Sequence, residues 1–292
     1  MIVAARTVHF ASAILLFGEL LLALTVAAPM WRDDARAIEA GPGLLSRALR
    51  FGAWTLAASV VSAVVWLIGE GSAMSGKPIA QIGADTVGLV LSSTVFGRLW
   101  IGRLGLALVL GALLWAIGRS DGGRRRLHLA VGALLVAAGY LATLAWTGHA
   151  AAGPPVQVVS DVTHLIAAGA WLGALPGFVV LLGCAQPVSI TAQVTRRFST
   201  LGVLSVGTLV VTGIGNAWYL VGDVPGLIGT AYGRLLLAKL ALFAAMVTLA
   251  SDPGSGADRM DRIFDPFFTT KRTAWGLARR SRSRSPTPTT AT

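Results

Sequence analysis

The sequence predicts an all-α fold, a polytopic transmembrane bundle of about seven helices. Of its 292 residues, 54% are apolar and only 13% are charged, which is about half the charged share of roughly 25% found in soluble domains. A soluble domain of this length could not bury so much apolar surface. The composition therefore excludes soluble globular enzymes, disordered proteins and disulfide-stapled secreted domains. The lone cysteine, Cys184, also excludes an intrachain disulfide.

Seven apolar runs reach or approach the length of about 20 residues that crosses a bilayer. The first run is longer than the roughly 7–15 apolar residues of a signal peptide. Only Arg6 precedes it, so we expect a retained span. Residues 79–91 are expected to form an amphipathic segment on the membrane surface. The predicted spans are 7–29, 49–69, 98–118, 127–147, 160–183, 198–220 and 232–250.

Cationic side chains fall unequally on the two predicted faces, ten on the face opposite the N-terminus and five on the other. Because cytoplasmic loops carry the excess of Lys and Arg, we expect an external N-terminus and a cytoplasmic C-terminus. These loop cations also account for much of the net charge of +11, so no nucleic-acid partner is expected. The ten are Arg32, Arg36, Arg47, Arg50, Arg119, Arg124, Arg125, Arg126, Arg196 and Arg197; the five are Arg6, Lys77, Arg98, Arg103 and Arg234.

Three of the four histidines are predicted to share one end of the bundle. His9 begins the first span, His149 ends the fourth, and His164 lies one turn into the fifth. Three imidazoles at one depth indicate a metal site, and neutral imidazole suits copper, zinc, iron and nickel. The alternative is that each histidine is an interfacial side chain bonded to a backbone carbonyl. His128 lies at the opposite face and is not expected to take part.

Other polar residues are expected to support this site. Asp161, one turn before His164, is expected to orient its imidazole or to attract the cation. Trp171, seven residues beyond His164, is expected to wall the site. Asn216, near the external end of the sixth span, is expected to bond across helices or to join the histidine layer.

Two charges are predicted to lie deeper in the membrane. Glu19 falls near the middle of the first span and Lys239 about a third of the way into the seventh. Charges at such depth are costly, so we expect the two to pair; the alternative is that Lys239 extends to the interface. Small residues at Gly169, Gly173 and Gly177 recur at the four-residue spacing of closely packed membrane helices.

Several stretches containing these residues resemble the CopD family, the bacterial copper-resistance proteins of the inner membrane. The opening helix with its early His9 fits the family as well, and the likeness runs from residue 1 to about 249. The matching stretches are Thr94–Arg103 (TVFGRLWIGR), Trp146–Ala150 (WTGHA), Asp161–Gly173 (DVTHLIAAGAWLG), Arg197–Asn216 (RFSTLGVLSVGTLVVTGIGN) and Thr230–Phe243 (TAYGRLLLAKLALF).

The resemblance implies a multi-pass protein of the bacterial inner membrane that handles copper and is not an enzyme. It implies copper movement from periplasm to cytoplasm, often beside a periplasmic copper-binding partner (CopC), and copper ligation by His9, His149 and His164. The oxidation state of the copper stays open. Two other interpretations are a haem-binding electron carrier, since paired histidines ligate haem axially, and an assembly scaffold without a ligand.

The last part of the chain departs from the family. The family continues into an eighth span, which we expect to be missing, so residues 1–250 form the CopD-like domain. Residues 251–292 resemble a fragment of a sensor histidine kinase ATP-binding domain, with a first glycine box at Asp252–Gly256 and a phenylalanine box at Ile263–Lys271. Because the asparagine box and a complete glycine-rich lid are absent, we expect a degenerate, disordered segment with a low-complexity basic tail and no kinase activity.

Overall fold

The computed structural model describes residues 1–27, 35–148, 153–183, 188–221 and 224–251, and all its regular elements are helical. Two compact units divide the chain, Met1–Arg234 and Leu235–Thr292. The helices are α1 (Ile2–Leu22), α3 (Ala35–Ser75), α4 (Ala84–Ser93), α5 (Val95–Arg119), α6 (Gly123–Ala142), α7 (Pro155–Ala168), α8 (Leu175–Gly183), α9 (Val188–Val221), α10 (Val224–Gly229) and α11 (Ala231–Ser251). Short 3-10 or π turns extend or link them at η1 (Ala23–Ala27), η2 (Ile79–Gln81), η3 (Thr143–Thr147) and η5 (Gly169–Gly173).

Six helical stretches in the described part of the chain are long and apolar enough to cross a membrane. They correspond to the first six predicted spans, and the first runs from Ile2 to Ala27; its retention stays a prediction. The predicted seventh span is helical as α11, although its crossing of the membrane stays a prediction. The six stretches are 2–27, 43–75, 95–119, 123–147, 155–183 and 191–219.

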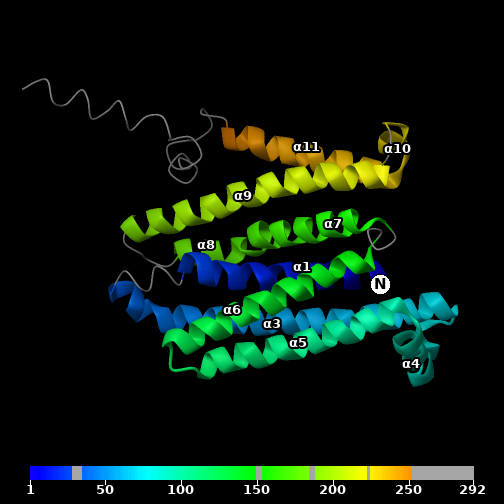
Figure 1. Ribbon diagram of the computed structural model, residues 1–292, viewed down its shortest axis with the longest axis horizontal. Helices are drawn as coiled ribbons and strands as arrows, with labels where there is room; N and C mark the ends of the chain where they lie inside the picture. Colours follow the sequence, from blue (N-terminus) through cyan, green and yellow to red (C-terminus); the bar gives the residue numbers. More distant parts are fainter. Residues whose placement is uncertain (28–34, 149–152, 184–187, 222–223, 252–292) are drawn as a thin grey trace, which may run out of the picture. The chain divides into compact units, whose positions relative to one another are not determined.

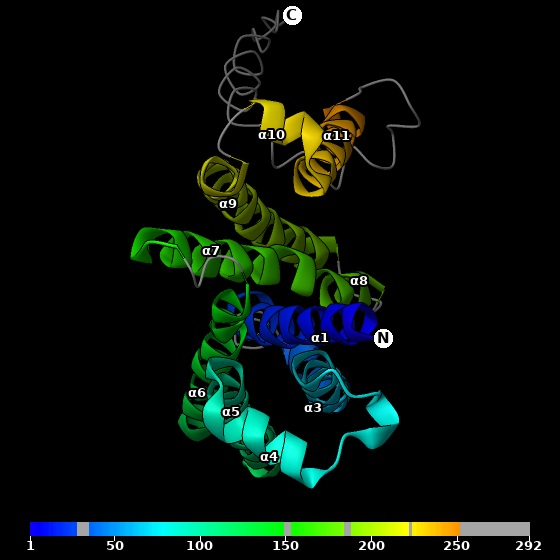
Figure 2. The same ribbon diagram turned by 90° about the vertical axis from the view of Figure 1, so that its right-hand side faces the viewer.

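Helix α1 is the central element of the first unit. It lies between α3 on one side and α7 with α8 on the other (Figures 1 and 2), and it also packs against α6. Its inner face carries small and apolar side chains such as Ala13, Leu16 and Phe17, which are almost fully buried in one core cluster with residues of α5 and α6. The bundle is thus organised around α1.

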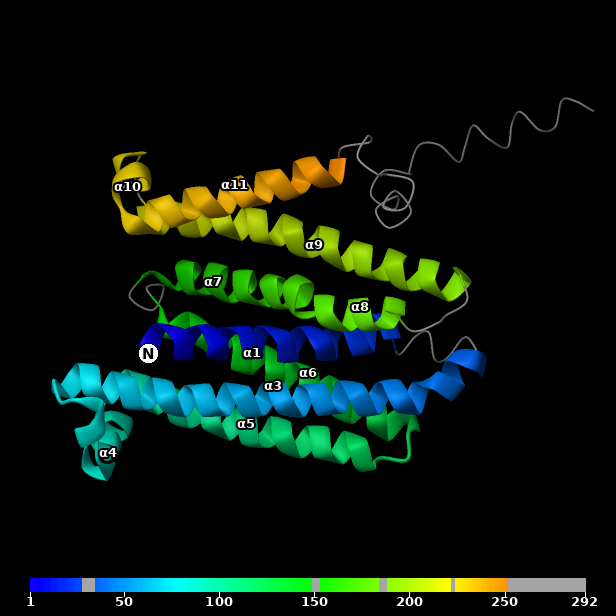
Figure 3. The ribbon, with the colours of Figure 1, turned by 180° about the vertical axis from the view of Figure 1, so that it is seen from behind.

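Helix α9 packs against α7 and η5, and Figure 3 shows it on the far side of α7 and α8 from α1. A second core cluster lies here, in which Phe178 and Phe198 stack with ring centroids 4.0 Å apart. The predicted surface segment 79–91 is helical as η2 and α4, which connect α3 to α5. Its position on the membrane surface stays a prediction.

The predicted packing role of the small residues is confirmed at α1. A side chain on Gly173 would collide with the carbonyl oxygen of Ile14, and one on Gly18 would collide with the backbone at Gly173. The helix breaks at this crossing because Pro176 has no N–H and its ring excludes a bond to Leu172. The backbone absorbs the break as the π turn η5.

Candidate metal site

His164 of α7 is bonded to α9, and α7 begins at the end of the bundle where α1 also begins (Figure 1). Its Nδ1 lies 2.9 Å from Oγ1 of Thr212. That hydroxyl donates its own proton to the carbonyl oxygen of Thr208, at 2.6 Å, so it accepts from Nδ1–H of His164. The bond to Thr212 thus orients the ring through Nδ1, and imidazole in its neutral form ligates metals through a ring nitrogen.

Two further polar residues face each other one turn toward the same end of these helices. Nδ2 of Asn216 lies 3.5 Å from Oδ1 of Asp161, and Ser160 donates to the backbone oxygen of Thr212 at 3.3 Å. Asn216 is only 9% exposed, and its Oδ1 is a buried acceptor without a hydrogen-bond donor. A buried oxygen without a donor is costly, and a cation would satisfy it.

We call the residues Asp161, His164, Thr212 and Asn216 the α7–α9 cluster. It combines an imidazole nitrogen, a carboxylate and an amide oxygen, all of which are metal-ligating groups. His149, the predicted ligand preceding α7, lies outside the described residues. Within the part of the chain that is described, no three His, Cys, Asp or Glu side chains form a metal-binding group, so the three-histidine site stays a prediction.

His9 has a different environment, although it was predicted at the same level. It is completely buried on α1, and its Nδ1 donates to the backbone oxygen of Ser59 at 2.8 Å. Its Nε2 contacts a guanidinium nitrogen of Arg103. Because arginine only donates, Nε2 is the acceptor, and both ring nitrogens of His9 are bonded to protein groups.

Arg103 is the centre of this second group of residues, which joins α1, α3, α5 and α6. Its side chain is 5% exposed and donates to the backbone oxygen of Tyr140 at 3.0 Å and to the hydroxyl of Thr143. The guanidinium also lies 4.4 Å from the centre of the Tyr140 ring. Neutral acceptors and an aromatic face thus accommodate the buried cation, and His9 is one of these acceptors.

Glu19 has a backbone partner in the first unit. Its Oε1 accepts from the backbone N–H of Gly177 at 2.7 Å, near the start of α8, where the helix break leaves N–H groups without helical acceptors. A side chain on Gly177 would collide with this carboxylate. Lys239 belongs to the second unit, so its pairing with Glu19 stays a prediction.

Trp171 lies in η5, two turns along the chain from His164, and its indole packs near Gly202 of α9 and the second core cluster. Gly213 of α9 is instead the glycine near the His164 ring. Since eleven residues of helix span about 16 Å, the indole and the imidazole contact different levels of α9. This geometry shows no contact between Trp171 and His164, so the predicted role of Trp171 in lining the site stays a prediction.

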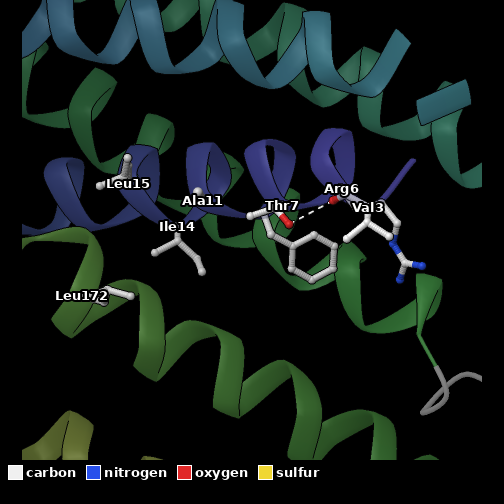
Figure 4. A pocket seen from close by; sticks show the side chains of 8 residues that line it. Val3, Arg6, Thr7, Ala11, Ile14, Leu15 and Leu172 are labelled. Carbon is white, nitrogen blue, oxygen red and sulfur yellow. Dashed lines mark hydrogen bonds between the residues drawn. The ribbon is translucent and has the colours of Figure 1, made fainter. Parts of the chain in front are cut away.

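An open groove of about 590 Å³ runs along α1 and is also lined by Leu172 of η5 (Figure 4). Its lining is apolar except at one end, where Arg6 and Thr7 lie. The hydroxyl of Thr7 donates to the backbone oxygen of Val3 at 2.9 Å. A groove whose charged lining residue is an arginine does not attract a metal cation.

Sequence reasoning missed Thr212, Ser59 and Arg103, which hold the two histidines. Arg103 was counted only as a loop-side cation, yet it lies eight residues inside α5. An arginine that far into an apolar run was a signal that a polar partner faces it inside the bundle.

The helices and the buried polar groups define the class, a multi-pass α-helical membrane protein with two polar centres between its helices. Residues 1–158 match the family model described as "Copper resistance protein D-like, N-terminal domain". Residues 192–253 match the model "Copper resistance protein D". The chain belongs to the copper resistance protein D family.

Two characterised relatives agree with this assignment. The chain is 31% identical over 263 residues to copper resistance protein D of Pseudomonas syringae pv. tomato, covering 85% of this chain and 79% of the relative. It is 35% identical over 118 residues to copper transport protein CutJ of Bacillus subtilis, covering 39% of this chain and 22% of CutJ. No solved structure matches the chain.

The family models end at residue 253, and none of these matches supports the predicted histidine kinase fragment. Residues 252–292 lie outside the described residues. The kinase resemblance therefore has no support beyond the two short boxes in the sequence.

Proposed function

We propose that this protein is an integral inner-membrane copper transporter that moves copper from the periplasm to the cytoplasm and contributes to copper tolerance. The family assignment supports copper handling, and the similarity to copper transport protein CutJ of Bacillus subtilis supports transport. The observation that carries the proposal is the α7–α9 cluster, in which a buried Asn216 oxygen without a donor lies beside Asp161, one turn from His164.

Copper in this proposal is bound first at the end of the bundle where α1 and α7 begin. His164 is the ligand with the strongest support, because its bond to Thr212 orients the imidazole, as residues behind metal ligands do. His149 is the second proposed ligand. His9 is the third predicted ligand, and it can contribute only if Arg103 leaves its Nε2.

The proposed direction follows from the cation asymmetry of the loops, which makes this end of the bundle periplasmic. A periplasmic copper-binding protein of the CopC kind is the proposed donor there, as the family resemblance implies. The haem alternative is not favoured, because axial ligation by His9 would require it to give up a bond to Ser59 or to Arg103.

Copper accumulation in bacterial cells tests the transport proposal. Cells expressing the wild-type chain should accumulate more cytoplasmic copper than cells carrying the empty vector, and cells expressing His164→Ala should not. His128→Ala is the matched control, since His128 is an exposed histidine at the start of α6, at the other end of the bundle. Equal accumulation with and without the wild-type chain would contradict transport, and a Soret band in the purified protein would favour the haem alternative.

A further inference from the structure

The first unit contains the same helical motif twice. His164 follows His9 by 155 residues, and in this register Gly173 corresponds to Gly18. Both histidines lie on helices that begin at the same end of the bundle (Figure 1). Each is bonded to the next long membrane-spanning stretch of the chain, His9 to α3 and His164 to α9.

Helices α3 and α9 repeat each other in a register of 146 residues. Residues 59–70 read SVVSAVVWLIGE and residues 205–216 read SVGTLVVTGIGN, with six identities in twelve positions. In this register Trp66 corresponds to Thr212 and Glu70 to Asn216. The pairs of helices that hold the two histidines are therefore related in sequence as well as in packing.

The next element repeats in atomic detail. Thr94 begins α5 by accepting from the N–H of Gly97 at 2.9 Å and donating to the oxygen of Val90 at 2.7 Å. Thr230 accepts from Gly233 and donates to Gly226 at the same two distances. All three pairs of equivalent residues are 136 apart, and Lys239 stands at the position of Arg103 in this register.

The two repeats meet at their equivalent glycines. A side chain on Gly18 would collide with the oxygen of Gly169, and one on Gly173 would collide with the oxygen of Ile14, which is the equivalent residue. The glycine of each helix thus faces the same backbone oxygen, by position in the repeat, of the other helix. Such reciprocity is the mark of a local two-fold axis, and repeats that begin at one face place the axis along the membrane normal, with transport sites often near the repeat interface.

The two equivalent sites differ in charge. One turn before the histidine, the first repeat has Arg6, whose guanidinium lies 5.2 Å from the centre of the Trp66 ring, and the second has Asp161. Trp66 in turn donates to Glu70 at 2.9 Å. The second repeat replaces this arrangement by Asp161 and Asn216, which are 3.5 Å apart.

We propose that copper binds only in the second repeat, at His164 with Asp161 and Asn216, and that His9 is its structural counterpart and not a ligand. This inference rests on the proposed copper function and removes His9 from the predicted histidine ligands. In the first repeat, Arg103 takes the nitrogen that a metal would need, and Arg6 repels cations from the groove beside α1. In the second repeat, the carboxylate of Asp161 stands at the position of Arg6, and Asn216, whose amide oxygen is buried and unsatisfied, stands at that of Glu70.

Copper titration of the purified full-length chain tests the inference, using Cu⁺ and Cu²⁺ separately as probes. His9→Gln keeps an acceptor for Arg103 and should bind copper within about twofold of wild type, whereas His164→Gln should lose about tenfold or more in affinity. Circular dichroism and a monodisperse elution profile establish that each variant is folded. Equal losses in both folded variants would overturn the inference and leave the copper function standing.

A second pair of variants keeps the test decisive if His9→Gln does not fold. Asp161→Arg gives the second repeat the residue of the first and should lower copper affinity about tenfold or more. Arg6→Asp, the reciprocal change, should leave it nearly unchanged, because Arg6 lies over the Trp66 ring of the first repeat and is not part of the α7–α9 cluster. A clear gain in affinity for Arg6→Asp would implicate His9 and overturn the inference. Absence of copper binding by the wild type would overturn the proposed function itself.

Discussion

His9 and His164 both donate through Nδ1, and their surroundings decide what each can do. The acceptor for His9 is a backbone oxygen, and its Nε2 is committed to Arg103. The acceptor for His164 is the Thr212 hydroxyl, which itself donates a hydrogen bond to the backbone oxygen of Thr208. The bond to Thr212 therefore sets both the tautomer and the orientation of His164, the role that sequence reasoning had given to Asp161.

Replacing Thr212 by valine tests this role with little change in shape. Thr212→Val removes the acceptor for Nδ1–H, so both the tautomer and the ring orientation lose their restraint. Copper affinity should fall about 10–100-fold, as for other residues that orient metal ligands, with no loss of helix content by circular dichroism.

Thr200→Val is the matched control, because Thr200 is an exposed threonine of the same helix whose hydroxyl bonds only within α9, to Arg196. It should bind copper like the wild type. Comparable losses in both variants, or none in Thr212→Val, would show that the hydroxyl does not orient the ligand.

At the scale of the elements, apolar run length predicts most of what is observed. The six described stretches begin and end within seven residues of the predicted spans, because a membrane helix must satisfy its backbone internally across about 30 Å. The break at η5 was not predictable from run length, since the segment is apolar throughout. It depends on Pro176 and on the close approach of Gly173 to α1.

The candidate site was predictable in part. Because successive spans alternate in direction, the sequence predicts that the first and fifth spans begin at the same end, and α1 and α7 do so (Figure 1). Asn216 bonds across helices, to Asp161. The burial of Arg103 against His9 joins residues 94 positions apart, which helical periodicity cannot reveal. The internal repeat could have been found by aligning the two halves of the sequence. That alignment would have shown that Asp161 stands at the position of Arg6.

The glycine crossing of α1 and η5 yields a prediction at this scale. Gly173→Ala places a methyl group against the Ile14 oxygen, and such overpacking costs about 1–3 kcal/mol. The thermal midpoint of the detergent-solubilised protein should fall. Gly132→Ala is the control, because Gly132 lies within α6 with open space beside it, and alanine is favoured over glycine in a helix. A midpoint for Gly173→Ala equal to that of Gly132→Ala would contradict the crossing.

At the scale of the whole molecule, the proposed function depends on which side of the membrane holds the end of the bundle where α1 and α7 begin. Ten cations against five predict that this end is external. The α6–α7 connection and the α5–α6 turn lie at opposite ends of the bundle (Figure 1), so one probe in each reports the orientation.

Cysteine labelling in intact cells measures this orientation. In a Cys184→Ser background, Gly153→Cys should react with a membrane-impermeant maleimide, and Asp121→Cys should react only after the membrane is permeabilised. The reverse pattern would place the α7–α9 cluster at the cytoplasmic end and would reverse the proposed direction of entry.

The central claim is that the α7–α9 cluster holds copper, and the copper content of the protein purified from copper-grown cells tests it most directly. Elemental analysis should find stoichiometric copper in the wild type and in His128→Ala, and only trace copper in a folded His164→Ala variant. Copper in His164→Ala at the wild-type level would contradict the claim, because it would place the metal away from the imidazole that Thr212 orients.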